Sequence, residues 1–208
     1  FDVKEAKDLA NILKAGKLPA PARIVQSEIV GPSLGQESIT AGMISFAIAF
    51  VIVLVWMVFF YSKSGFYADI AIFVNILFIF GILASLGATL TLPGIAGIIL
   101  TIGMAVDANV IINERIKEEL RLGKSDKQAV RDGYGNAYSS IIDANVTTFL
   151  TSLILFIFGK GPIQGFATTM MIGIITSLIT AIFVSRLFIE ADLKHGRKLN
   201  VSTSIVKN

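Results

Sequence analysis

Five long apolar runs dominate the sequence from residue 39 onward and constrain its fold more than any other feature. An α-helix needs about 20 apolar residues to cross the hydrocarbon core of a bilayer, and only helices and closed barrels satisfy every backbone hydrogen bond in lipid. The runs are Ile39–Tyr61, Tyr67–Leu86, Leu92–Asn113, Ser140–Phe158 and Ile163–Ile189. They predict an all-α membrane protein built as a bundle of five transmembrane helices.

Composition supports a membrane protein and excludes several kinds of site. Of the 208 residues, 54% are hydrophobic and 16% are charged, whereas soluble domains have about 45–50% and about 25%. The absence of cysteine excludes disulfides, thiolate metal sites and a cysteine nucleophile. The single histidine, His195, lies in a basic tail with Lys194 and Lys198, which is typical of a solvated segment. We expect no metal and no cofactor.

The first 38 residues are polar and indicate the end of a soluble domain. Glu5–Lys14 has apolar residues at helical spacing, and Arg23–Val30 is typical of a strand that Gly31-Pro32 ends. The chain begins at Phe1, and no cleavable signal precedes the first apolar run. We therefore expect it to be a piece of a longer protein.

The polar connection Glu114–Ala137 sets the expected orientation. Its basic residues are Arg115, Lys117, Arg121, Lys124, Lys127 and Arg131. Lysine and arginine concentrate in the cytoplasmic loops of membrane proteins, so alternation places Lys63 and the tail 191–208 in the cytoplasm and the N-terminus outside. Within the connection, Lys124–Asp132 is predicted to form a short amphipathic helix on the membrane surface. Acids balance the basic residues, so nucleic-acid binding is not expected.

Two aspartates interrupt the third and fourth runs, and each opens the same four letters. The repeats are Asp107-Ala108-Asn109-Val110 and Asp143-Ala144-Asn145-Val146. An ionised carboxylate in hydrocarbon is costly, and such residues are functional candidates by default. A carboxyl escapes the cost by taking up a proton, because desolvation disfavours the charged form. Both aspartates are therefore candidates for a proton relay.

The predicted orientation puts both aspartates on the cytoplasmic half of the bundle, with Asp107 the deeper of the two. They become neighbours if the third and fourth helices pack, and Asn109 and Asn145 then supply hydrogen-bond partners. Two structural alternatives remain open: helix capping by Asp143, and an Asp107 carboxyl that a neighbouring helix satisfies. Arg186, the nearest basic residue on another run, is expected to snorkel toward water. A counter-charge for Asp107 is therefore expected from a partner chain.

Small residues recur every four positions in the last run, and this spacing lets helix backbones approach closely. They are Gly165, Thr169, Gly173, Ser177, Ala181 and Ser185. The third run carries a shorter series at Gly97, Thr101 and Ala105. Gly103 lies four residues before Asp107 and offers a flat face beside the acid. These residues are expected to pack helices together.

The second run contains two further polar residues, Asp69 and Asn75. Asp69 is expected in the first helical turn, where the helix dipole favours an anion. Asn75 is expected to hydrogen-bond between helices. Both are interpreted as structural.

Several stretches carry a family likeness: Val30–Gly35, Thr91–Gly97, Gly103–Val110, Glu114–Glu119, Asp143–Thr148 and Gly165–Ala167. They resemble the junction before the second transmembrane helix, and the fourth, fifth and sixth helices, of the SecD family. This family of bacterial protein-export subunits belongs to the resistance-nodulation-division (RND) superfamily. The tail Lys198–Ser204 resembles the linker into SecF in fused SecDF chains. The resemblance spans nearly the whole chain.

The resemblance implies that the five runs are the second to sixth helices of a six-helix RND-type half, after the C-terminal end of the first periplasmic domain at residues 1–38. It implies that the protein pairs with SecF, separate or fused, and with the SecYEG channel. Such a protein uses the proton-motive force to assist preprotein translocation across the inner membrane. Asp107 would be the relay carboxylate, and Asp143, Asn109 and Asn145 would hydrate or orient it.

Three other functions fit part of the pattern. An RND-type small-molecule or ion exporter needs similar helices. An intramembrane aspartyl protease also uses two carboxylates that share a proton, but its glycine and tyrosine positions are Ala105 and Ile142 here. A structural scaffold predicts that Asp107→Asn is silent. The sequence has no Ser/His/Asp set and no phosphate-binding glycine loop, so the chain is not expected to be an enzyme.

Overall fold

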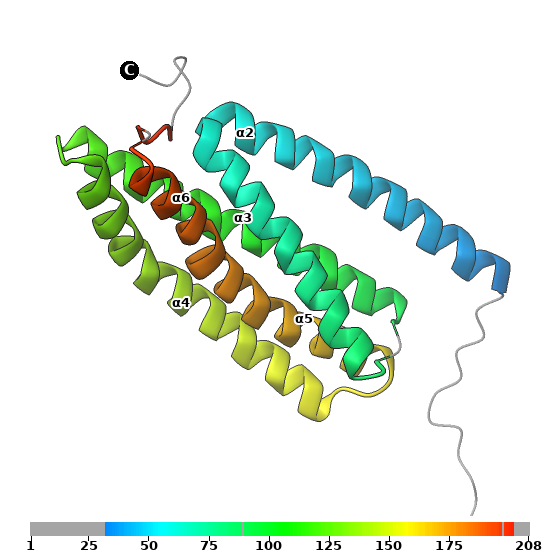
Figure 1. The fold of residues 1–208 in the computed structure, drawn as a ribbon. Helices are drawn as coiled ribbons and strands as arrows, with labels where there is room; N and C mark the ends of the chain where they lie inside the picture. Colours follow the sequence, from blue (N-terminus) through cyan, green and yellow to red (C-terminus); the bar gives the residue numbers. More distant parts are fainter. Residues whose placement is uncertain (1–31, 89, 197, 202–208) are drawn as a thin grey trace, which may run out of the picture. The chain divides into compact units, whose positions relative to one another are not determined.

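The computed structural model describes residues 32–201, except 89 and 197, and every regular element in that part is a helix (Figure 1). The order is α2 (Pro32–Ser85), α3 (Leu92–Arg121), α4 (Asp126–Phe158), α5 (Pro162–Ile179), a π-helical turn η1 (Thr180–Val184) and α6 (Ser185–Lys194). The predicted helix Glu5–Lys14 and strand Arg23–Val30 lie outside the described residues. The chain divides into two compact units, Phe1–Thr40 and Ala41–Asn208, and the second contains the contacts between the helices α2 to α6.

Four helical stretches in the described part are long and apolar enough to cross a membrane. They are Ile39–Ser85, Leu92–Arg121, Asp126–Phe158 and Pro162–Lys194. The prediction of an all-α membrane fold is confirmed, with four apolar helical stretches in the described part of the chain. The runs Ile39–Tyr61 and Tyr67–Leu86 lie on two helical arms of α2, and a break in the helix at Ser62 separates them.

The break in α2 is at Ser62, which has φ 51° and ψ −125°. A positive φ is uncommon for a residue with a side chain, and Figure 1 shows α2 turning back on itself at this point. A Cβ at Gly65 would collide with the backbone oxygen of Met57. Glycine is therefore required where the two arms of α2, residues 41–61 and 63–85, approach each other.

One prediction about the connection between α3 and α4 is wrong. α3 continues beyond the third apolar run, which ends at Asn113, as far as Arg121, so the polar connection Glu114–Ala137 is mostly helical. Lys124–Asp132 does not form a separate surface helix, because most of it is the start of α4. α4 then runs without interruption through the predicted fourth apolar run.

Polar pairs between the ends of α3 and α4 explain why both helices extend beyond their apolar runs. Lys124 Nζ lies 2.5 Å from Glu119 Oε2 and 2.7 Å from Asp132 Oδ2. Asn136 Nδ2 donates to Glu119 Oε1 at 2.7 Å. The hydrogen bonds to Asp132 and Glu119 raise the pKa of Lys124 above its ordinary value. The charged residues therefore satisfy one another across a helical hairpin.

α3 and α5 pack together through the small residues that recur every four positions in each. A Cβ at Gly97 would collide with Thr169 Oγ1, and a Cβ at Gly173 would collide with Thr101 Oγ1. The two series thus interlock. Beyond this contact, α5 passes through η1 into α6, so the last predicted run is one continuous helix with a π-helical turn inside it.

Two apolar clusters hold this unit together. The first includes Met57 and Tyr61 of α2, Ile112 and Ile116 of α3, Tyr134 and Ile141 of α4, and Ile189 of α6. The second joins Ile72, Ile79 and Leu83 of α2 to Ile98 and Ile102 of α3. Many other large apolar side chains are exposed, including Trp56 at 58% and Phe183 at 68%. Such a surface suits contact with lipid or with other apolar helices.

Replacing Gly133 should weaken the α3–α4 contact, because a Cβ there would lie 2.8 Å from the backbone N and Cα of Ile116. Overpacking of this kind typically costs about 1–3 kcal/mol. Gly133→Ala is therefore expected to lower the midpoint of thermal unfolding in detergent. Gly135→Ala is the matched control on the same helix, since nothing lies within 4 Å of its Cβ position. Equal midpoints for the two variants would contradict the close contact.

Candidate functional site

α3 carries polar residues on two different faces. Its buried face presents Thr101, Ala105, Asn109, Asn113 and Lys117, spaced four apart and each at most 6% exposed. Residues four apart lie on the same side of a helix. Asp107 is outside this series and lies on the exposed surface of the unit. The acid and the buried asparagines of α3 therefore point to different surroundings.

Asp107 borders a small hollow of about 60 Å³ between α3 and α4. The hollow is lined by Met104, Asp107, Ala108, Ile111, Ile141, Ala144, Asn145 and Thr148. Asn145 Nδ2 donates to Ile141 O at 2.8 Å, whereas Asn145 Oδ1 is buried and has no hydrogen-bond partner in the described part of the chain. A water molecule needs about 10–15 Å³. The hollow therefore joins the Asp107 carboxyl to polar groups of α4 and has room for water.

The other two predicted relay residues, Asp143 and Asn109, do not line this hollow. Asp143 is exposed on α4. Asn109 is 2% exposed, and its Nδ2 donates to Ala105 O at 2.9 Å. Between residues 32 and 201, as far as the structure describes them, no basic side chain forms an ion pair with either aspartate. The fold thus brings Asp107 together with Asn145 but does not bring the two aspartates into one cavity.

The packing residues predicted from sequence fall into two groups. Gly165 faces Thr91, which caps the start of α3, Gly173 faces Thr101 of α3, and Ser177 is 2% exposed. Gly103 has no atom within 4 Å of its Cβ position. Gly103 therefore lies on open surface in this chain, whereas the other three lie in the α3–α5 contact or the buried interior.

The second arm of α2 contains two buried polar groups that the sequence analysis treated as structural. Asp69 Oδ1 is buried without a hydrogen-bond partner among the described residues, and both side-chain polar atoms of Asn75 are in the same condition. Asp69 lies seven residues after the break at Ser62, beyond the first turn in which a helix dipole stabilises an anion. An unsatisfied buried polar group costs about 1–3 kcal/mol. Asp69 therefore keeps one buried carboxylate oxygen without a partner in the second arm of α2.

The break in α2 is tied to α3 and to the residues after α6. Ser64 Oγ donates to Asn113 Oδ1, and Ser64 N donates to Asn200 O at 3.2 Å. Leu199 N donates to Asp126 Oδ2, at the start of α4, at 2.9 Å. The chain after α6 thus bridges the start of α4 and the break in α2.

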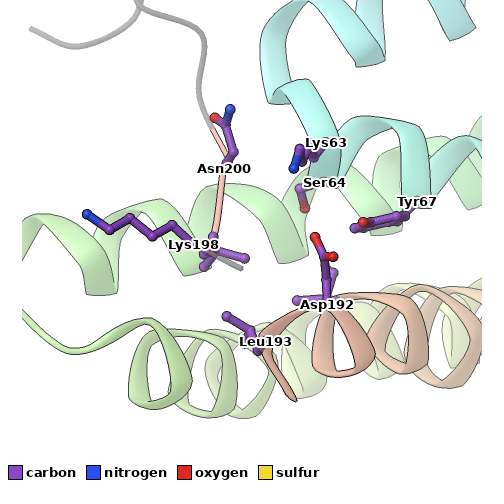
Figure 2. A pocket seen from close by; sticks show the side chains of 9 residues that line it. Lys63, Ser64, Tyr67, Asp192, Leu193, Lys198 and Asn200 are labelled. Atoms are coloured by element: carbon purple, nitrogen blue, oxygen red, sulfur yellow. The ribbon is translucent and has the colours of Figure 1, made fainter. Parts of the chain in front are cut away.

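Figure 2 shows Ser64, Asp192 and Asn200 gathered around the pocket at this junction, from α2, α6 and the following segment. The pocket offers only about 10 Å³, which is at the lower limit for a single water molecule. The junction is therefore a packing contact and not a ligand site. The contact was not predicted from sequence, because its residues are far apart in the chain; the four-residue spacing of Asn109 and Asn113 indicates only that both lie on one face of α3.

The sequence matches a described family over most of its length. The family model for protein export membrane protein SecD/SecF, C-terminal, matches residues 12–193. Protein translocase subunit SecD of Rhodothermus marinus is 54% identical over 96% of this chain and 32% of its own length. The subunit of the same name in Desulfurispirillum indicum is 52% identical over 97% of this chain and 39% of its own. The chain thus spans about a third of the length of these relatives.

The fold is similar to solved structures as well. A crystal structure of SecDF, a translocon-associated membrane protein from Thermus thermophilus, superposes with a TM-score of 0.83 at 36% identity, over 99% of this chain and 29% of that one. SecDF in the super-membrane-facing form gives a TM-score of 0.79 at 36% identity, over 100% of this chain and 28% of that one. The helical architecture and both kinds of match agree, and the chain belongs to the SecD/SecF family of protein export membrane proteins.

Proposed function

We propose that this chain is the C-terminal membrane part of a proton-motive-force-coupled subunit of the bacterial Sec machinery, which assists preprotein translocation across the inner membrane. Its relatives named protein translocase subunit SecD support the export role. The proton coupling rests on one observation. Asp107 lies at the middle of α3, exposed and without a cationic partner in the described chain, beside a mainly apolar hollow to which Asn145 and Thr148 contribute polar groups.

An ionised acid at this place in a spanning helix needs a partner or a proton, because hydrocarbon solvates charge poorly. Protonation of Asp107 removes one negative charge from the surface between α3 and α4, and deprotonation restores it. α3 is interlocked with α5 through Gly97 and Gly173. The charged and the neutral carboxyl of Asp107 prefer different surroundings. A change of protonation state therefore moves α3, together with α5, relative to α4. This relative movement is the proposed conformational output.

The roles proposed for the other relay residues follow from their positions. Asn145 shares the hollow with Asp107, so it hydrates or orients the carboxyl directly. Asp143 and Asn109 lie outside the hollow and act through the packing of their own helices. The rival aspartyl-protease mechanism needs two carboxylates that share one proton. It gains no support, because no second acid lines this hollow.

We propose that α2 crosses the membrane twice, once with each arm, which gives five spans. The stretch Ile39–Ser85 has 47 residues, or about 70 Å of helix at about 1.5 Å per residue, against about 30 Å of hydrocarbon. Residues 1–38 are then periplasmic, and both the α3–α4 turn and residues 191–208 are cytoplasmic. The partners are SecF, the SecYEG channel and the translocating preprotein, and the missing counter-charge for Asp107 comes from a partner chain.

Replacing Asp107 tests the proton coupling. In the full-length protein, Asp107→Asn should reduce preprotein export to the level seen without a proton gradient, because asparagine cannot exchange a proton. The assay is preprotein import into inverted inner-membrane vesicles with and without the gradient. The amount of variant protein in the membrane, measured by immunoblotting, should equal wild type.

Matched variants locate the titrating acid. Asp69→Asn and Asp143→Asn are measured separately in the same vesicles, and each should retain a larger gradient-dependent fraction of export than Asp107→Asn. Wild-type gradient dependence in Asp107→Asn would exclude Asp107 as the relay. A loss confined to Asp69→Asn would transfer the role to Asp69 of α2.

The orientation predicts which loops a membrane-impermeant reagent can reach. This chain has no cysteine, so single cysteines are introduced by Leu122→Cys in the α3–α4 turn and Lys160→Cys between α4 and α5, in a cysteine-free full-length background. In intact spheroplasts a charged maleimide should label the cysteine at position 160, and it should label the one at 122 only after permeabilisation. The reverse pattern would invert the proposed topology.

A further inference from the structure

The basic residues near the α3–α4 turn form two electrostatic groups. Three basic residues of α3 and the turn lie close to acids: Arg115 to Glu118 at 2.7 Å, Lys117 to Glu114 at 2.8 Å, and Lys124 to Glu119 at 2.5 Å. Arg121 of α3 is exposed and forms no ion pair in the described chain. Lys127 and Arg131 of α4 are exposed and form no ion pair with any residue that the structure describes. Lys127 and Arg131, four residues apart, therefore place two unpaired positive charges on one side of α4.

This side of α4 faces α6 across a groove. The groove consists of two hollows of about 260 Å³ and 280 Å³, which share Arg131 and Arg186 in their walls. One hollow also contains Tyr134, Tyr138 and Ile182, and the other contains Lys127, Glu190 and Lys194. We call the two hollows together the α4–α6 groove. One end of it is apolar and aromatic, and the other end is charged.

The α4–α6 groove is strongly positive, and one of its arginines is held in position. Its cations are Lys127, Arg131, Arg186 and Lys194, and its single acid is Glu190. Arg186 Nε lies 2.6 Å from Glu190 Oε1, and the guanidinium stands 5.4 Å from the ring centroid of Tyr134. The Tyr134 hydroxyl is 2.8 Å from Ser185 Oγ, which fixes the ring against α6. The groove thus keeps an excess of positive charge after its internal ion pair forms.

The groove lies where exposed apolar surface meets charge. Tyr138 in the groove wall is 54% exposed on α4. Phe183 and Leu187, which follow the groove residues Ile182 and Arg186 in sequence, are 68% and 67% exposed. Tyrosine is enriched at membrane–water interfaces, and basic pockets between transmembrane helices bind the head groups of anionic lipids. A ligand of this groove should therefore combine a negative group with a long apolar part.

We propose that the α4–α6 groove binds an anionic phospholipid. Its phosphate lies between Arg131 and Arg186, because guanidinium groups bind phosphate oxygens through paired hydrogen bonds. Lys127 and Lys194 face the remaining polar head group, and the acyl chains follow the exposed apolar side chains beside Tyr138 and Phe183. An acidic protein segment would match the charge but not the apolar end of the groove. The proposal does not depend on proton coupling through Asp107.

Native mass spectrometry of the full-length protein tests this site. The purified protein is mixed with equal amounts of dioleoyl phosphatidylglycerol and dioleoyl phosphatidylcholine, which have the same acyl chains. Wild type should retain phosphatidylglycerol at activation energies that remove phosphatidylcholine. The double variant Lys127→Gln with Arg131→Gln should bind phosphatidylglycerol roughly thirtyfold more weakly, from the usual contribution of two basic residues near an anionic lipid. Both side chains are exposed and unpaired, so folding should be unaffected.

A charge-matched control separates the groove from general attraction. Arg115→Gln with Arg121→Gln removes two charges from α3, outside the groove, and should retain wild-type lipid binding. Equal retention of both lipids by wild type, or equal losses in the two double variants, would overturn the proposal. So would competition by inorganic phosphate at the same concentration as lipid, which would indicate a free-phosphate site. Unchanged lipid binding with reduced co-purification of SecF would assign the groove to a protein partner and overturn it as well.

Discussion

The close approach of α3 and α5 is the contact on which the rest of this membrane unit depends. At Gly97 and Gly173 the neighbouring helix leaves no room for a Cβ. Lipid tails are as apolar as leucine, so helices in a membrane associate through such close packing and not through the hydrophobic effect. The contact also fixes the rotation of α3. Asn109 and Asn113 are turned inward, and Asp107 is left on the surface beside α4.

Polar contacts join the remaining elements at one end of the unit. Ser64 bonds Asn113, Leu199 bonds Asp126 and Tyr134 meets Ser185, so α2, α3, α4 and α6 are linked there. The unit therefore combines a region of linked polar side chains near the α3–α4 turn with helices that are mainly held by apolar packing. The proposed lipid site lies in the first region, where a bound head group would brace α4 against α6. The proposed proton site lies deeper, between α3 and α4.

Sequence pattern predicted the apolar helices and the small-residue series, because helix length and four-residue spacing are local properties. It separated the first two runs at the right place, but it did not predict the positive φ of Ser62, since nothing in that side chain signals the conformation. It failed at Lys124, where charge density indicated a separate surface helix. The decisive partners, Glu119 and Asp132, are brought close only by the packing of α3 on α4. At the candidate site, the two aspartates could be recognised from the sequence. That they do not line one cavity depends on how α3 and α4 are rotated, which the sequence does not show. Asp69 Oδ1 lacks a hydrogen-bond partner because tertiary packing buries it, and no pattern in the sequence indicates this burial.

The central claim is that the Asp107 carboxyl exchanges a proton when the membrane is energised. Infrared difference spectroscopy of the full-length protein with its partner in proteoliposomes measures this exchange directly, with the Asp107 band assigned by its absence in Asp107→Asn. The account predicts that the protonated-carboxyl band of Asp107 changes intensity when a proton gradient is imposed. A band that stays constant with and without the gradient, while gradient-dependent export continues in the same preparation, would contradict it.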